Sequence, residues 1–426
     1  MKDVTLRSKL IAMNFLQFAV WGAYLICMGR YLGSLGLGDK IGIFYSIQGI
    51  VSIFMPALMG IVADRWISAQ RLLGLCHLIA GGAMVILSVV AYPMGANPSF
   101  SVLFPIYTLS VAFYMPTLAL SNSVAYTALE QAGADIVKAF PPIRVFGTIG
   151  FIASMLAVDL LGFQESPMQF QVSGILGVVL FVYSFFLPHC PTAPHGEKKS
   201  LSEALGLRAF SLFRDPKMAM FFIFSMLLGI NLQITNGFAN PYLASFGELD
   251  AYKGAFGVEH SNILISLSQI SETLCILLIP FLLKRLGIKR VMLIAMICWV
   301  LRFALLGAGN PGGGVWLFVL SMIVYGMAFD FFNVSGSLFV DRETDSSIRS
   351  SAQGLFMLMT NGIGATIGTL GAQWVVNYFV KSEHDAVARV AGWSMSWYAF
   401  ALFALVVMIL FWILFRYDGD RVKNKT

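Results

Sequence analysis

The sequence predicts an all-α membrane protein with twelve transmembrane helices in two six-helix halves. Charged residues make up 12% of its 426 residues, against roughly 25% in soluble domains. Hydrophobic residues make up 58%, and the mean hydropathy is +0.78. Apolar stretches of about 20 residues, enough to cross a bilayer as a helix, recur along the whole chain. This composition excludes a soluble domain with a single membrane anchor.

Twelve spans result when the sequence is divided at charged residues and at Gly- or Pro-rich points. They cover residues 9–34, 41–63, 71–93, 99–126, 141–163, 168–188, 216–245, 261–283, 288–308, 313–340, 349–379 and 391–415. No small-residue cleavage site ends the first apolar stretch, so we interpret it as a retained span and not as a signal peptide. An even number of spans puts both termini on one side.

The distribution of Lys and Arg predicts that this side is cytoplasmic. Of the 28 basic residues, 21 lie at the termini and in the loops on the same side. The opposite loops carry Arg30, Lys40, Lys253, Lys381 and Arg389. The positive-inside rule therefore puts both termini in the cytoplasm. We attribute the net charge of +6 to this orientation and not to nucleic-acid binding.

The longest polar segment, residues 189–215, separates an N-terminal half (1–188) from a C-terminal half with a short cytoplasmic tail (216–426). We interpret this cytoplasmic linker as carrying a short amphipathic helix at the membrane interface. A capping-box pattern and apolar residues indicate that helix: Ser200, Glu203, Leu205, Phe210 and Phe213. A linker without structure is the alternative. Weak internal repetition supports two halves, since residues 60–65 after the second span match the place of residues 283–290 after the eighth.

Cysteine and histidine positions argue against metal and enzyme chemistry. The cysteines lie in or at the ends of apolar runs, without a Cys-x-x-Cys pair: Cys27, Cys76, Cys190, Cys275 and Cys298. We expect buried free thiols, no disulfide framework, no metal site and no cofactor. The five histidines are dispersed, mostly at loops, whereas an enzyme needs a nucleophile–base or metal cluster. No loop is long enough for the soluble output domain of a sensor.

Two carboxylates at membrane depth indicate a functional site. None of the ten residues on either side of Asp330, in the tenth span, is Lys or Arg. A carboxylate there costs about 2.5–3.5 kcal/mol by insertion scales, and such residues normally face a protein interior or a watery cavity. Glu272 is the second carboxylate, and Arg144 and Arg302 balance the pair. Since a proton on either carboxylate unbalances the interior, both are proton-coupling candidates, and Asp159 is a weaker one. A structural pair between Glu272 and Arg302 is the alternative.

Polar and aromatic residues recur at three- or four-residue spacing in four spans, which puts them on shared helix faces. They are Arg144, Thr148 and Phe151 in the fifth span, Gln233 and Asn236 in the seventh, Gln269 and Glu272 in the eighth, and Tyr325, Phe329 and Asn333 in the tenth. Amides both donate and accept hydrogen bonds, and aromatic rings stack on planar ligands. The pattern therefore predicts a site for a neutral, polyfunctional solute. The alternatives are a snorkelling arginine, amides that join helices, and core packing of the aromatic residues, which is our interpretation of Phe331 and Phe332.

Two further expectations concern helix geometry. Pro141 and Pro142 suit the first turn of the fifth span. The eleventh span is rich in glycine, which permits close helix approach and sliding; its glycines include Gly354, Gly362, Gly364, Gly368 and Gly371.

Twelve spans in two halves, with the loop element Gly60-Ile-Val-Ala-Asp-Arg65, resemble the major facilitator superfamily, whose halves rock about a midplane site. Within it, the chain resembles nucleoside:proton symporters and is similar to bacterial nucleoside permeases. The matching stretches span nearly the whole chain: Phe15–Phe18 with Trp21, Phe54–Leu58, Phe140–Phe151, Phe222–Gly229, Leu232–Asn236, Ser268–Thr273, Ile323–Asn333, and Ser351–Gly354 with Met359–Gly362.

The resemblance implies a secondary active transporter that imports nucleosides by proton symport, through alternating access, across the bacterial inner membrane. Its partners would be a nucleoside, a proton and the lipid bilayer, and we expect a monomer. Ten residues would line the nucleoside site: Arg144, Thr148, Phe151, Gln233, Asn236, Gln269, Glu272, Tyr325, Phe329 and Asp330. Tyr325 or Phe329 would stack on the base. Because amide-rich, aromatic-lined cavities also suit sugars, a sugar or oligosaccharide proton symporter on the same fold is the alternative.

Overall fold

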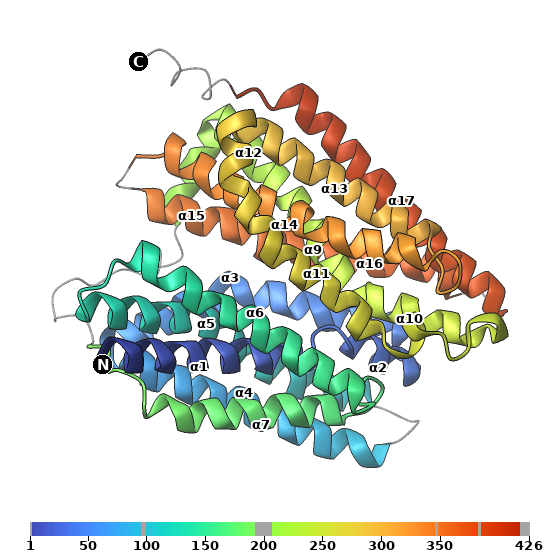
Figure 1. The fold of residues 1–426 in the computed structure, drawn as a ribbon, viewed down its shortest axis with the longest axis horizontal. Helices are drawn as coiled ribbons and strands as arrows, with labels where there is room; N and C mark the ends of the chain where they lie inside the picture. The colour runs from blue at the N-terminus through green and yellow to red at the C-terminus, as the bar shows by residue number, and fades with distance from the viewer. Residues whose placement is uncertain (1, 95–98, 192–206, 346–347, 382–384, 418–426) are drawn as a thin grey trace. The chain divides into compact units, whose positions relative to one another are not determined.

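The computed structural model describes residues 2–94, 99–191, 207–345, 348–381 and 385–417 (Figure 1). This part of the chain contains helices and turns and no strand, which confirms the all-α class. Ten of the helices within it are long and apolar enough to cross a membrane. The chain divides into two compact units, unit 1 (Met1–Leu205) and unit 2 (Gly206–Thr426).

Unit 1 is a bundle of long helices with two short 3₁₀ turns (Figure 1). Its described elements are α1 (Lys2–Gly22), α2 (Met28–Ser34), η1 (Gly38–Lys40), α3 (Ile41–Arg65), α4 (Ala69–Ala91), η2 (Tyr92–Met94), α5 (Phe100–Gln131), α6 (Ile136–Leu160) and α7 (Met168–Ser184). Helix α1 packs against α6 and α7, α4 packs against α5 and α7, and α3 packs against α5.

Unit 2 is a second bundle in which several long segments are interrupted (Figure 1). Its described elements are η3 (Leu207–Arg214), α9 (Pro216–Ser245), η4 (Phe246–Glu248), η5 (Asp250–Tyr252), α10 (Phe256–Glu259), α11 (Ser261–Cys275), η6 (Ile276–Leu278), α12 (Ile279–Leu286), α13 (Ile288–Ala308), α14 (Val315–Glu343), α15 (Arg349–Met357), η7 (Leu358–Gly364), α16 (Ala365–Val380) and α17 (Ala386–Leu414). Helix α13 packs against α14 and α17, α9 packs against η7 and α16, and α11 packs against α14.

The two units share one packing plan. In unit 1 the pairs are α1 with α6, α3 with α5, α4 with α5 and α4 with α7. In unit 2 the pairs are α9 with α16, α11 with α14, α13 with α14 and α13 with α17. Counted along each unit, the first long segment packs against the fifth, the second against the fourth, and the third against the fourth and sixth. The packing therefore repeats more clearly than the sequence does.

The first and sixth predicted spans of unit 1 differ from the structure. In the first span, α1 ends at Gly22 and α2 begins at Met28. Within this break the Tyr45 hydroxyl donates to the Leu25 carbonyl, which satisfies an acceptor that the end of a helix leaves unpaired. Helix α1, with basic residues in its first turns, is not among the ten membrane-length helices, and α7 has only 17 residues.

The fifth predicted span also begins elsewhere. Helix α6 starts at Ile136, so Pro141 and Pro142 lie inside the helix and not in its first turn. Each proline lacks an N–H and leaves a carbonyl of the preceding turn without its usual intrahelical partner.

The eleventh span contains a π-helical segment, η7, between α15 and α16. Such segments are short, rare and frequent at functional sites. Beside η7, Gly229 of α9 lies so close to Thr360 that a Cβ on the glycine would overlap the threonine backbone. Gly364 and Gly368 likewise approach the α9 backbone, whereas Gly354 and Gly371 meet nothing within 4 Å. The predicted close approach therefore involves only part of the glycine set.

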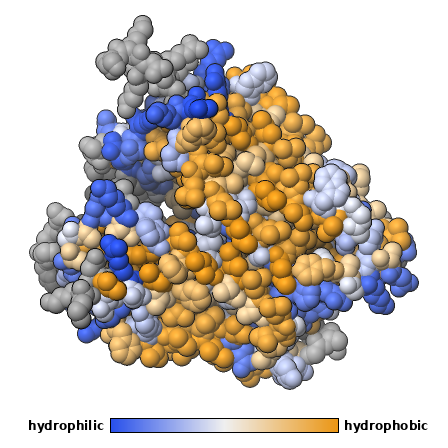
Figure 2. Space-filling view, in the orientation of Figure 1, coloured by the Kyte–Doolittle hydropathy of each residue, from blue (hydrophilic) through white to orange (hydrophobic). Residues whose placement is uncertain are grey.

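The linker is described only from residue 207. There, η3 packs on α9, since Phe213 lies 5.6 Å from Phe222 between ring centroids and stacks on Phe210 at 6.0 Å. The predicted capping box and Leu205 lie outside the described residues. Figure 2 shows hydrophobic residues over the helix flanks and hydrophilic residues gathered at helix ends, as a surrounding bilayer requires.

Candidate functional site

In unit 1, α6 carries all three predicted site residues. Arg144 is half-buried, and its guanidinium carbon lies 3.9 Å from the ring centroid of Phe18 on α1. Thr148 is half-buried one turn further on, and Phe151 is buried. The Phe151 ring meets Trp21 edge-on, at 6.4 Å between centroids. The predicted helix face therefore packs against the aromatic side of α1.

A buried polar network in unit 1 was not singled out from the sequence. Gln17 of α1 donates to Thr117 Oγ1 (2.7 Å), pairs with His77 Nε2 (2.7 Å), and accepts from the Tyr114 hydroxyl at its carbonyl (2.8 Å). The network joins α1, α4 and α5. Beside it, the buried Trp21 Nε1 has no hydrogen-bond partner among the described residues. Asn14 and Gln17, three residues apart in the apolar run of α1, were the sequence signal available.

In unit 2, the amide-rich stretch of α9 divides into two kinds of residue. Asn236 Nδ2 donates to Gln233 Oε1 at 3.1 Å, which confirms that the two share a face. Asn240 instead pairs with Asn262 at the start of α11 (2.6 Å), and Thr235 accepts from a buried arginine. These two serve helix packing, as the alternative interpretation expected.

That arginine is Arg302 of α13, which is 0% exposed. It donates to Thr235 (3.3 Å), Ser268 (3.4 Å) and the Ser321 carbonyl (2.9 Å). Its guanidinium carbon also lies 4.4 Å from the Tyr325 ring centroid. These contacts tie α13 to α9, α11 and α14. Among the described residues, the contacts of Arg302 do not include the pairing with Glu272 that the sequence left open.

A glycine brings the two acidic helices together. A Cβ on Gly326 of α14 would lie 2.6 Å from the Glu272 nitrogen of α11, and the Ser271 hydroxyl donates to the Ile323 carbonyl. Glu272 is half-buried at this contact, and Asp330 lies one turn beyond Gly326 on α14. Asp330 is 6% exposed, and its Oδ2 accepts no hydrogen bond from the described residues. The two proton-coupling candidates therefore share one region of unit 2.

An aromatic stack adjoins this region. The Tyr325 and Phe329 rings are parallel within 4°, with centroids 6.0 Å apart. Trp299 of α13 meets Tyr325 edge-on at 5.9 Å. Tyr325 is buried between Arg302 and Phe329, whereas Phe329 is half-buried. Phe329 is thus the accessible ring, and Tyr325 supports it from behind.

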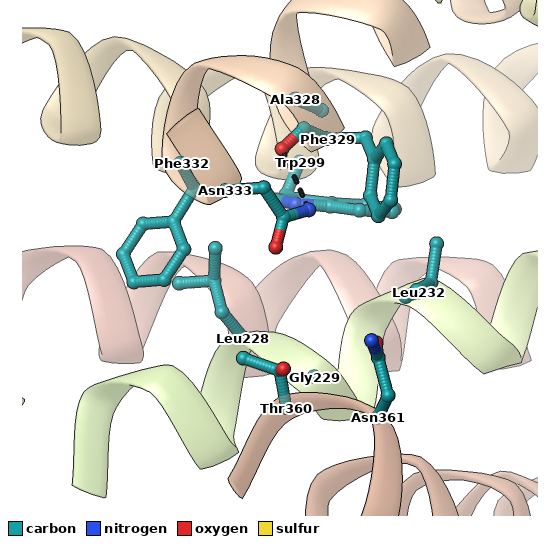
Figure 3. A pocket seen from close by; sticks show the side chains of 10 residues that line it. All are labelled: Leu228, Gly229, Leu232, Trp299, Ala328, Phe329, Phe332, Asn333, Thr360 and Asn361. Atoms are coloured by element: carbon teal, nitrogen blue, oxygen red, sulfur yellow. Dashed lines mark hydrogen bonds between the residues drawn. The ribbon is translucent and has the colours of Figure 1, made fainter. Parts of the chain in front are cut away.

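A pocket opens beside Phe329 (Figure 3). About 270 Å³ of space, including space open to solvent, lies among its walls. The lining residues come from α9, α13, α14 and η7: Leu228, Gly229, Leu232, Trp299, Ala328, Phe329, Phe332, Asn333, Thr360 and Asn361. The lining is mostly apolar with a few polar side chains, which is the composition typical of ligand sites.

The predicted site residues divide between the two units. Arg144, Thr148 and Phe151 share α6 in unit 1. In unit 2 the remaining seven lie on α9, α11 and α14, of which α11 packs against both others. Gln269 is buried at 9% exposure, one turn before Glu272. Of the ten predicted residues, only Phe329 lines the pocket.

Several pocket residues were missed. Trp299, Thr360 and Asn361 come from helices without a predicted site, and Phe332 was interpreted as core. Phe332 is indeed buried, yet it also lines the pocket. The polar pair Thr360–Asn361 inside an apolar span was the signal available. All five cysteines are free and buried, as predicted.

A helical chain of many membrane-length segments, with carboxylates, amides and aromatic rings gathered at membrane depth, is a multi-pass membrane transport protein. A family model described as "Nucleoside H+ symporter" matches residues 4–420. The chain belongs to that family, and it is a nucleoside:proton symporter and not an enzyme.

Relatives that match over nearly their full length support this family assignment. The chain is 45% identical to the xanthosine permease of Escherichia coli and 44% identical to the nucleoside permease NupG of the same organism, with 99% of each chain covered in both comparisons. Crystal structures of the nucleoside transporter NupG match with TM-scores of 0.90, for a variant, and 0.87. These cover 96% and 97% of this chain and 100% of the solved chains, at 44% identity.

Proposed function

We propose that this symporter imports nucleosides into the cytoplasm, across the bacterial inner membrane, by alternating access of two six-helix halves with twelve spans. The packing plan repeated in the two units supports the two halves, because rocking transporters of this kind are built from internal repeats. The excess of Lys and Arg on one side supports cytoplasmic termini. We expect a monomer that is surrounded by lipid.

The substrate contacts follow from the chemistry of each helix face. Phe329 stacks on the base, because Tyr325 is buried behind it. Gln233, Asn236 and Gln269 donate to and accept from the polar edges of the base or ribose. In unit 1, Arg144, Thr148 and Phe151 form the second group of substrate contacts.

Proton coupling rests on Asp330 and Glu272. The observation that carries this proposal is that both residues lie where α11 and α14 meet at Gly326, next to the aromatic stack of α14. Adding a proton to either carboxylate removes a charge from a region where charge is costly. Substrate occupancy and protonation therefore act on the same group of side chains. Arg144 contributes a positive charge from unit 1.

Uptake measurements test the proposal. Cells that express the chain should accumulate labelled uridine and adenosine, and an imposed inward proton gradient should accelerate uptake. The pair of substitutions Asp330→Asn and Glu272→Gln should abolish the gradient dependence. The control is Glu130→Gln, an exposed carboxylate at the end of α5, which should behave as wild type.

Two results would contradict the proposal. Uptake indifferent to the gradient would rule out coupling, and wild-type transport by the double variant would rule out the carboxylate site. Competition by excess maltose or other sugars would favour the sugar symporter over the nucleoside symporter.

A further inference from the structure

The pocket of unit 2 is lined mainly by apolar and aromatic side chains. Trp299, Phe329 and Phe332 contribute three aromatic rings, and Leu228 and Leu232 of α9 lie opposite them (Figure 3). Trp299 and Phe332 are buried, whereas Phe329 is half-buried and offers an accessible ring. An aromatic face favours a planar ligand ring through stacking. The accessible Phe329 ring therefore suits a planar nucleobase better than the non-planar ring of a ribose.

Asn333 presents a fixed acceptor to this pocket. Its Nδ2 donates to the Phe329 carbonyl at 3.2 Å. A carbonyl only accepts, so this bond assigns which end of the amide is nitrogen. The Oδ1 atom is thereby directed away from α14, toward the space above Leu228 and Thr360 (Figure 3). Asn333 is half-buried, so a ligand can reach this oxygen.

The opposite wall comes from the π-helical segment η7. The Thr360 hydroxyl donates to the Phe356 carbonyl at 2.9 Å, so it is occupied within its own helix. In the described part of the chain, the hydrogen bond of the Asn361 amide is the one that it donates to the Met357 sulfur, at 3.8 Å, which is a weak acceptor. Its amide points into the pocket (Figure 3) and can turn either its donor or its acceptor toward a ligand.

We infer that this pocket holds the nucleobase, with Asn333 Oδ1 accepting a hydrogen bond from a ring N–H or exocyclic amino group on the base edge. Asn333 is then a specificity-determining residue, and Asn361 adapts to whichever group lies beside that donor. The inference rests on the proposed nucleoside transport. It adds that the base is the part of the nucleoside in this pocket and that Asn333 recognises it. A base whose donor is methylated both loses the hydrogen bond and crowds the Asn333 oxygen.

The test compares two ligands in three proteins. Uridine carries an N3–H donor, and 3-methyluridine carries a methyl group in its place. Each competes with labelled uridine for uptake by wild type, Asn333→Leu and Asn377→Leu. Asn377 of α16 is the matched control, because it is half-buried but does not line the pocket. Surface expression of each variant is measured in parallel.

In wild type, 3-methyluridine should compete about tenfold more weakly than uridine, the size expected for one hydrogen bond. Asn333→Leu should bring this ratio close to one, mainly by weakening uridine, and Asn377→Leu should keep the wild-type ratio. The inference is overturned if wild type does not discriminate between the ligands. It is also overturned if Asn333→Leu transports uridine with the wild-type ratio.

If Asn333→Leu does not reach the membrane, Asn333→Ala is assayed in the same way, and the wild-type ratio is a test by itself. Failure of the proposed function would give a different result, because cells that express the wild-type protein would then take up no labelled uridine. Intact uridine uptake with an unchanged ratio refutes only the role of Asn333.

Discussion

Arg302→Met should preserve the fold of unit 2 and impair transport. The substitution replaces a fully buried cation with an unbranched apolar side chain that fills most of its volume. It removes the hydrogen bonds to Thr235, Ser268 and the Ser321 carbonyl. It also removes the guanidinium from the face of Tyr325, which supports the accessible ring of the candidate site.

The free energies nearly cancel. Hydrogen bonds between membrane helices contribute about 0.6 kcal/mol each, and a desolvated cation–π contact contributes about 2 kcal/mol, or about 4 kcal/mol together. A cation at membrane depth costs about 2.5–3.5 kcal/mol by insertion scales. Replacing a buried ion by an apolar residue is often close to neutral. The free energy of unfolding should therefore change by about 1 kcal/mol.

Substrate affinity should change more. Without the cation–π contact, Tyr325 supports Phe329 less firmly. If the whole contact energy of about 2 kcal/mol is lost from substrate binding, the affinity for the nucleoside falls about thirty-fold. Thermal unfolding of the purified protein and the KM of uridine uptake measure the two effects. Arg302→Lys is the control: it keeps the charge but not the planar fork, and should fall between Met and wild type. Wild-type KM in Arg302→Met, or a loss of more than about 3 kcal/mol of stability, would refute this reasoning.

Two further predictions concern packing and a thiol. Gly326→Val should destabilise unit 2 by about 1–3 kcal/mol and impair proton-driven uptake, because the valine side chain would collide with the α11 backbone beside Glu272. Gly371→Val is the control, because a Cβ there meets nothing within 4 Å. Equal shifts of the thermal unfolding temperature in the two variants would contradict the close contact. Burial raises the pKa of the Cys190 thiol to about 11, although the hydrogen bond with Gln70 lowers it in part. The thiol therefore stays protonated at pH 8, with about one molecule in a thousand as reactive thiolate. In a variant whose other four cysteines are replaced by serine, alkylation of Cys190 should be slow at pH 8 and should accelerate steadily up to about pH 11. Rapid labelling at pH 8 would contradict this prediction.

Long apolar runs made most of the fold predictable. Helix α13 occupies the predicted span 288–308 at both ends, because flanking glycines and basic residues mark where the apolar run stops. The breaks were not predictable in the same way. The π-helical η7 forms where Gly229 admits the Thr360 backbone, which is a consequence of helix packing and leaves no mark on hydropathy.

Spacing predicted which residues share a helix face but not what each face meets. The Gln233–Asn236 hydrogen bond and the Tyr325–Phe329 stack both follow from three- and four-residue spacing. Spacing did not distinguish Thr235, whose hydroxyl accepts from Arg302, from its neighbours on α9. That distinction depends on which helix lies alongside, and sequence periodicity carries no information about neighbours.

The two buried charges of α13 and α14 illustrate why this distinction matters for function. Arg302 is fully buried, and protein hydroxyls, a carbonyl and an aromatic face surround its guanidinium. Asp330 is almost as buried, yet one carboxylate oxygen has no hydrogen-bond partner in the described part of the chain. Buried polar groups are normally satisfied, and an exception in a native fold requires an explanation. The satisfied charge fits a positioning role, whereas the unsatisfied one fits a group whose partner is the transported proton or solute. Burial alone therefore does not identify a transport residue; a buried carboxylate with an unused oxygen is a sharper criterion, and Asp330 meets it.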